Sequence, residues 1–140
     1  MKKLLPMLLL FALALTLVAC GGQNPMKDAL TVTRNTGSIE IRVYSNTDQT
    51  YTDYVITDRA TVREICDTFS SLELKETKVG MHADAYTVSF CNANGLAVNS
   101  LAVVASENNT ISYENEMYRV QEDFDVHAYV AGLVEGAAQK

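Results

Sequence analysis

The chain has 140 residues, a formal net charge of −6, three cysteines and no tryptophan. This length allows one hydrophobic core and is too short for two. The acidic balance argues against nucleic acid as a partner and against a polybasic contact with anionic lipid, because both require clustered lysine or arginine.

The first 19 residues have the layout of a secretory signal peptide. Lys2 and Lys3 precede an apolar stretch over residues 4–18, and small residues follow before the chain turns polar. A transmembrane anchor needs roughly 20 apolar residues, whereas this stretch is shorter and interrupted by Pro6. We therefore expect a signal peptide over residues 1–19.

The stretch "LVAC" at residues 17–20 resembles the lipobox of bacterial lipoproteins. The resemblance implies cleavage before Cys20, lipid on its thiol, and a mature protein anchored on the extracytoplasmic face of the cell membrane. Two or more acyl chains hold a domain at a membrane durably. Residues 20–37 are then expected to form the lipidated N-terminus and a flexible tether, although alternation over residues 29–33 leaves an edge strand open.

Two strands and a helix are predicted at the start of the folded domain. Residues 38–45 alternate between apolar and polar at the period of a strand with one buried face, and a second strand is expected over residues 51–57. Asp58 is placed to cap the helix that follows, with Thr61 and Glu64 as a second possible capping box. The helix should end near residue 70 or 71, with a buried stripe of Val62, Ile65, Phe69 and Leu72.

The rest of the chain predicts antiparallel strands and a second helix. A short strand after residue 71 leads to a hairpin over residues 86–104 with "NANG" as its turn, and a shorter hairpin centres on residues 114–116. The last helix carries Val126 and Val130 in its buried stripe and is capped by Asp123 or Asp125. We expect one α+β domain over residues 38–136, an antiparallel meandering sheet with two helices packed on one face, and a tail over residues 137–140.

The arrangement from "YVITDRATVREICDTFSSLEL" through "YTVSFCNANGLAVNSLAV" to "ISYENEMYRV" resembles small extracytoplasmic domains of unknown function that recur in lipoproteins of Gram-positive bacteria. The resemblance covers roughly the last hundred residues of the chain. It includes no diagnostic catalytic motif, so it implies a fold and an extracytoplasmic localisation but no activity.

Cys66 and Cys91 would lie in a compartment that permits disulfides. Cys66 falls on the apolar side of the predicted helix, whereas Cys91 is out of phase with the apolar residues of its strand. Because a disulfide requires Cβ atoms that face each other, placement on different sides of the sheet is favoured, and pairing remains the alternative.

Few residues suggest catalysis or metal binding. His82 lies in a predicted loop and His127 in the first turn of the last helix, and both are expected to be exposed. The chain contains neither a zinc motif nor a calcium-loop motif, and no cofactor is expected. An acidic cluster is a weak candidate for calcium, although a solvated surface with helix-capping carboxylates is favoured; its members are Glu114, Glu116, Glu122, Asp123 and Asp125.

Tyrosines are the remaining candidates for a contact surface, because tyrosine tolerates half-burial at an interface. Tyr44 is out of phase with the apolar residues of the first strand, which places it on the opposite face of the sheet. Tyr44 and Tyr54 are the candidates singled out from the seven tyrosines.

The combined pattern predicts a membrane-anchored lipoprotein with a non-enzymatic binding or accessory domain. The lipid on Cys20 provides the membrane contact, nucleic acid is not expected, and the protein or small-molecule partner is left open. One alternative is a small envelope hydrolase or metal-dependent enzyme that uses His82 and nearby carboxylates. Another is an inhibitor or immunity-type protein that presents its sheet face to a secreted enzyme.

Overall fold

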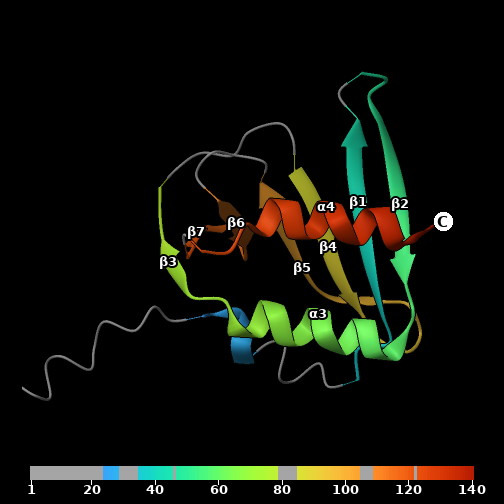
Figure 1. Ribbon diagram of the computed structural model, residues 1–140, viewed down its shortest axis with the longest axis horizontal. Coiled ribbons are helices and arrows are strands. Elements are labelled where there is room, and N and C mark those ends of the chain that lie inside the picture. Colours follow the sequence, from blue (N-terminus) through green and yellow to red (C-terminus); the bar gives the residue numbers. More distant parts are fainter. Residues whose placement is uncertain (1–23, 29–34, 46, 79–84, 105–108, 122) are drawn as a thin grey trace, which may run out of the picture.

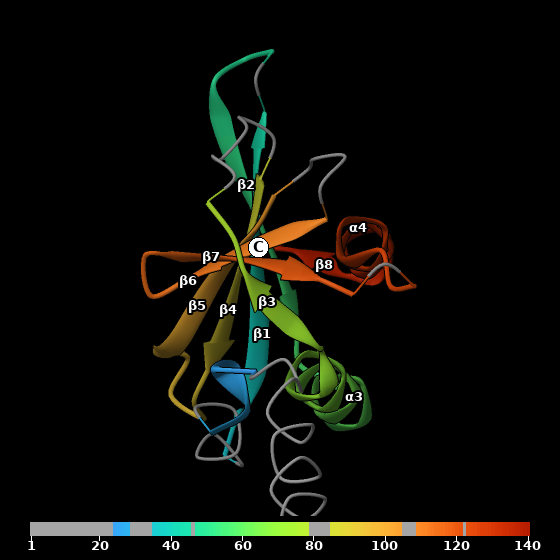
Figure 2. The same ribbon diagram turned by 90° about the vertical axis from the view of Figure 1, so that its left-hand side faces the viewer.

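The computed structural model describes residues 24–28, 35–45, 47–78, 85–104, 109–121 and 123–140. Its strands form one eight-stranded antiparallel sheet in the order β3-β7-β6-β5-β4-β1-β2-β8. Helices α3 (Arg59–Ser71) and α4 (Val126–Gly136) lie on the same side of this sheet (Figure 1, Figure 2). The predicted α+β fold with both helices on one face is confirmed. The strands are β1 (Ser38–Ser45), β2 (Thr50–Ile56), β3 (Leu74–Glu76), β4 (Ala85–Cys91), β5 (Ala97–Val104), β6 (Thr110–Tyr113), β7 (Glu116–Val120) and β8 (Ala138–Gln139).

The sheet is strongly twisted, as antiparallel sheets of many strands are. Figure 2 shows β6 and β7 running across the direction of β1 and β2. The β1–β2 hairpin extends past both helices, so its tip projects from one end of the molecule (Figure 1, Figure 2).

The core lies between the sheet and the two helices. Ile39 and Ile41 of β1 are fully buried there, as the alternation predicts. Phe69 of α3 sits edge-on to Phe90 of β4, with ring centroids 5.7 Å apart, and 6.1 Å from the ring of Tyr129 in α4. Such edge-to-face pairs add to the stability that burial of the rings provides. These aromatic contacts join both helices to the middle of the sheet.

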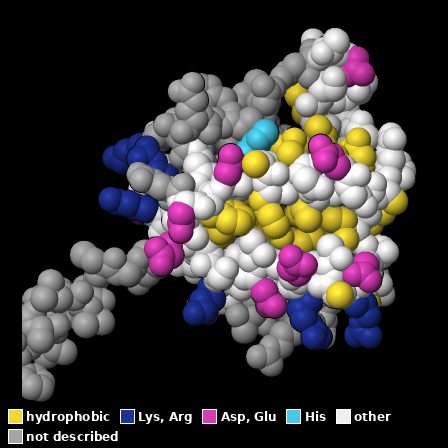
Figure 3. Space-filling view, in the orientation of Figure 1, with side chains coloured by type: hydrophobic (Ala, Val, Ile, Leu, Met, Phe, Trp, Pro, Cys, Tyr) yellow, Lys and Arg dark blue, Asp and Glu magenta, His cyan; other side chains and the backbone are white. Residues whose placement is uncertain are grey.

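The core reaches the surface between the two helices. Cys66, Tyr129 and Leu133 are only partly buried and pack against the core from α3 and α4. Figure 3 shows hydrophobic side chains along this strip, with acidic side chains on either side.

Both helices begin at an aspartate cap. Asp58 accepts hydrogen bonds from the backbone N and the hydroxyl of Thr61, at 2.9 and 2.7 Å. Asp125 accepts one from the backbone N of Ala128 at 2.9 Å. These bonds satisfy N–H groups that the first turn of a helix leaves without partners. The prediction of Asp58 is confirmed, α3 begins before the alternative start at Thr61, and Asp125 rather than Asp123 caps α4.

The predicted hairpins are present in the structure. Glu114 and Asn115 both adopt positive φ, 50° and 67°, between β6 and β7. A two-residue turn with this conformation suits the twist of an antiparallel pair. Between β4 and β5, Gly95 provides the positive φ that the "NANG" turn requires, at 74°.

Both ends of the described chain are packed where the sequence predicts a tether and a tail. Met26 is buried, with 1% of its surface exposed, and the side chain of Asn24 bonds to the end of α3. At the other end, β8 pairs with β2 at the edge of the sheet. The segment 29–33, the site of the possible edge strand, lies outside the described residues.

Candidate binding surface on the open face of the sheet

The face of the sheet opposite α3 and α4, here called the open face, is largely polar. Alternation along β1 places Glu40, Arg42 and Tyr44 on it, and the β1–β2 register adds Asp53 and Tyr51. The β1–β4 register adds Thr87, Ser89 and Cys91. This face is therefore built from cross-strand neighbours of three central strands, and no helix covers it in the described part of the chain (Figure 2).

An aromatic pair with an arginine lies at the hairpin end of the open face. Tyr44 and Tyr51 are directly opposite each other in the register, with ring centroids 5.0 Å apart. The guanidinium carbon of Arg42 is 5.6 Å from the centroid of Tyr51, within the range of a cation–π contact. Tyr51 keeps 65% of its surface exposed. We call Arg42, Tyr44 and Tyr51 the tyrosine patch.

The two tyrosines singled out from the sequence lie on opposite faces. Tyr54 pairs with Ile41 and packs against the core, so it belongs to the helix-covered face. Tyr44 lies on the open face, as its phase predicts. The sequence pattern does not identify Tyr51, because its place beside Tyr44 depends on the pairing register of the hairpin.

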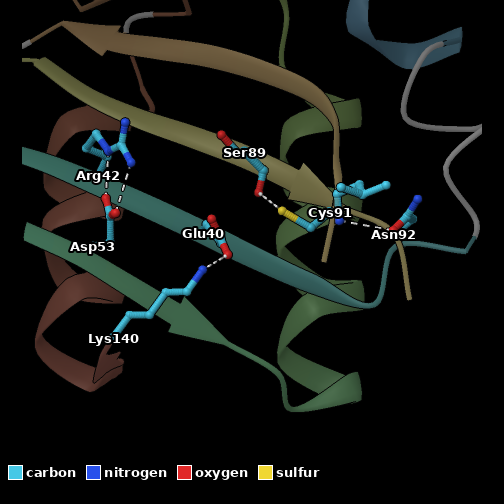
Figure 4. A network of polar contacts seen from close by, with 8 residues as sticks. Glu40, Arg42, Asp53, Ser89, Cys91, Asn92 and Lys140 are labelled. Atoms are coloured by element: carbon cyan, nitrogen blue, oxygen red, sulfur yellow. Dashed lines mark hydrogen bonds and ion pairs between the residues drawn. The ribbon is translucent and has the colours of Figure 1, made fainter. Parts of the chain in front are cut away.

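Two ion pairs cross the middle of the open face (Figure 4). Arg42 donates two hydrogen bonds to the carboxylate of Asp53, at 2.7 and 2.9 Å. This bonding lowers the pKa of Asp53 and raises the pKa of Arg42. Lys140, just after β8, contacts Glu40 at 2.6 Å. These four charges are paired with one another, so the arginine of the tyrosine patch adds no excess charge to its aromatic surface.

The two described cysteines lie on different sides of the sheet, as their phases predict. Cys91 is buried on the open face, with its sulfur 3.8 Å from the carbonyl oxygen of Ser89 (Figure 4). Cys66 is half-buried on α3, and both thiols are free. Burial raises the pKa of each thiol. Since the thiolate is the reactive form, these are poor nucleophiles at neutral pH.

The acidic cluster is divided among separate elements. Glu114 lies in the β6–β7 turn, Glu116 begins β7, Asp123 is exposed and Asp125 caps α4; Glu122 lies outside the described residues. Among the residues that the structure describes, no three His, Cys, Asp or Glu side chains are grouped as metal ligands.

Asn109 joins the segments next to Asp123 and Asp125, and no pattern in the sequence predicts this role. Its side-chain amide donates to the carbonyl oxygens of Gln121 and Phe124, and its side-chain oxygen accepts from the backbone N of Val126 at 3.1 Å. Asn109, which directly precedes β6, therefore links this strand to the segment between β7 and the start of α4. Its positive φ of 48° suits asparagine, which tolerates the left-handed region.

Of the two histidines, His127 lies within the described residues. His82 lies outside the described residues. His127 is half-buried with its ring 5.0 Å from the ring of Tyr86, so the prediction that it is exposed is wrong. The pKa of Tyr86 is raised by burial, with a further effect of Glu135.

A solvent-open hollow runs along the exposed side of α3, with Arg59, Arg63, Glu64 and Asp67 among its lining residues. Ligand sites are concave and mostly apolar with a few convergent polar groups. This hollow is instead lined by alternating surface charges, as the solvated side of a helix is.

Cys20 lies outside the described residues. Within the described ranges, no helix has the length and apolar character needed to cross a membrane. No family model, curated protein or solved structure matches the chain.

Proposed function

We propose that this protein is a bacterial lipoprotein, anchored through Cys20 on the outer side of the cytoplasmic membrane, whose domain binds a partner and catalyses no reaction. The proposed localisation is supported by "LVAC" at residues 17–20, at the end of an apolar stretch that lysines precede. The acyl groups supply the hold on the membrane, because the chain is acidic and lacks a basic cluster.

The tyrosine patch is the observation that carries the binding role. Tyrosine and arginine are enriched among the residues that dominate binding energy at interfaces. Tyrosine rings offer a large contact area at a low cost in conformational entropy. Tyr44 and Arg42 are positioned by the central strand β1, and Tyr51 by its hairpin partner. The charge of Arg42 is paired with Asp53, so a protein partner fits this patch better than a small ionic ligand.

Photo-crosslinking in cells tests the patch directly. The full-length chain is produced with the photo-reactive residue p-benzoylphenylalanine in place of Tyr51. A matched control carries it in place of Ala128, which is exposed on α4. We expect a defined protein adduct from position 51, a weaker one when Tyr44→Ser is added, and none from position 128. Equal adducts from both positions, or none from position 51, would contradict a binding role for this patch.

The lipid anchor has a separate test. Cys20→Ala removes the thiol that accepts the acyl group, so the precursor should remain unprocessed or be cut at another bond. Mass spectrometry of the wild-type protein should show an acylated Cys20 at the N-terminus. An unmodified N-terminus at any other residue would rule out the lipoprotein proposal.

An inhibitor or immunity-type protein is a special case of this proposal, in which the partner is a secreted enzyme. Once crosslinking has identified the partner, its enzymatic activity is measured with and without the purified domain. Loss of the partner's activity, relieved by Tyr51→Ser, is the expected result in that case.

A further inference from the structure

We propose that residues 92–98, the loop between β4 and β5 together with the start of β5 and here called the β4–β5 turn, contact the lipid interface of the membrane that carries the anchor. The inference rests on the proposed acylation of Cys20. It adds an orientation: one end of the domain faces the bilayer, and the tyrosine patch faces away from it.

The first step is the short distance between the anchor and the folded domain. Asn24 is fixed by hydrogen bonds from its side chain to the carbonyl oxygens of Phe69 and Ser70, at 2.9 and 3.0 Å. Met26, two residues later, is buried in the core. Cys20 is four residues before Asn24, and an extended chain reaches at most about 3.6 Å per residue, or about 14 Å in all. The C-terminal end of α3 is therefore held close to the acyl groups.

The second step is the position of the turn relative to this attachment. In both views, residues 24–28 and the β4–β5 turn lie toward the same end of the molecule, and the tip of the β1–β2 hairpin lies at the opposite end (Figure 1, Figure 2). The chain that leads into β1 also crosses the turn. The backbone N of Gly37 donates to the carbonyl oxygen of Cys91 at 2.8 Å. A Cβ at Gly37 would be only 3.0 Å from the Cα of Ala93, so the two segments are in close contact.

The third step is the composition of the turn. Its sequence, "NANGLAV", contains no charged residue. Among the described residues, only three large hydrophobic side chains are exposed, and two of them are Leu96 and Val98, at 65% and 52%. The third, Tyr51, belongs to the tyrosine patch. Exposed apolar side chains on an uncharged loop suit the membrane interface, because burial in lipid removes them from water.

The fourth step is the hydrogen bonding of the turn, which lowers the cost of entering a less polar medium. The side-chain oxygen of Asn92 accepts from the backbone N of both Asn94 and Leu96, at 2.9 and 3.1 Å. The backbone of Asn92 bonds to Leu96 and Gly95, each at 2.9 Å. Unsatisfied backbone groups are what keep most loops out of lipid. In this turn much of the backbone is already paired internally.

Single-tryptophan fluorescence tests the orientation, because the natural chain contains no tryptophan. Leu96→Trp and Val98→Trp place the probe in the turn, and Tyr51→Trp places a matched probe at the opposite end. All three positions are exposed, so the substitutions should not disturb the core. Each acylated full-length mature protein is reconstituted in phosphatidylcholine–phosphatidylglycerol vesicles, with or without bromine on the acyl chains.

We expect emission from position 96 or 98 to shift to shorter wavelength on vesicles and to lose intensity with brominated chains, and emission from position 51 to do neither. Unquenched emission from both turn positions of an acylated chain would overturn this inference alone. Equal quenching at all three positions would overturn the orientation. Mass spectrometry of the same samples identifies the remaining case: an unacylated Cys20 would overturn both this inference and the lipoprotein proposal.

Discussion

The side-chain amide of Asn24 donates to the carbonyl oxygen of Phe69, 45 residues later, at 2.9 Å. The last carbonyl groups of a helix have no partner within the helix. Asn24 satisfies two of them in α3, since it also bonds to Ser70. This contact makes the start of the described chain part of the domain.

Asn24→Ala should lower the free energy of unfolding by about 1–2 kcal/mol, the range for lost hydrogen bonds that leave partly buried acceptors unpaired. Urea denaturation of the mature chain with Cys20→Ser measures this loss. Asn94→Ala is the matched control, because Asn94 is exposed and its bond to Asn92 uses only its backbone. Equal losses in the two variants would show that the Asn24 contact does not stabilise α3.

Removing the buried sulfur of Cys91 should lower the free energy of unfolding more than removing the half-buried sulfur of Cys66. Cys91→Ala is expected to reduce stability by about 1 kcal/mol, at the low end of core truncations, and Cys66→Ala by less. Because the two thiols are free and on different sides of the sheet, a reductant should leave the thermal melting curve of the wild-type domain unchanged. A large fall in melting temperature on reduction would instead show that the sulfurs meet.

Stability should fall in acid because carboxylates are held ionised in the folded state. Hydrogen bonds from Thr61 lower the pKa of Asp58, and hydrogen bonding to Arg42 lowers that of Asp53. A group with a depressed folded-state pKa stabilises fully above its unfolded pKa, about 3.9 for aspartate, and loses that contribution as pH falls through the folded value. The free energy of unfolding should thus be level near neutrality and decline below about pH 4–5.

Asp58→Asn separates the cap from its charge. Asparagine caps helices about as well as aspartate, so stability near neutral pH should change little while the decline in acid becomes shallower. Urea denaturation at a series of pH values compares the variant with wild type. An acid decline identical to that of wild type would mean that Asp58 contributes nothing to it.

Calcium should leave thermal melting of the domain unchanged. Asp125 already caps α4, and the other described carboxylates of the cluster lie in separate elements. Asp125→Ala should cost about 1 kcal/mol through loss of the cap, and Asp123→Ala much less. Melts with millimolar calcium and with chelator provide the measurement. Binding to the native state would raise the melting temperature, and a rise abolished by Asp123→Asn with Asp125→Asn would establish an ion site.

Elements whose cause is local can be predicted from the sequence. Apolar and polar residues alternate along β1 and β4 at the period of a strand, which places Tyr44 of β1 and Cys91 of β4 on the open face. Asp58 was identifiable because a cap acts on N–H groups two or three residues away. Short hairpin connections forced the antiparallel order of β4 to β7.

Contacts between distant segments become visible in the folded structure alone. The contact of Asn24 with Phe69 and the pairing of β8 with β2 join residues far apart in the chain, and no local pattern marks them. Tyr51 completes the tyrosine patch only because the hairpin register sets it opposite Tyr44. A register shift of one residue would move every side chain of β2 to the other face. Periodicity determines the face of its own strand or helix on which a residue lies. Which residues of other elements it contacts depends on how the whole chain buries its apolar surface.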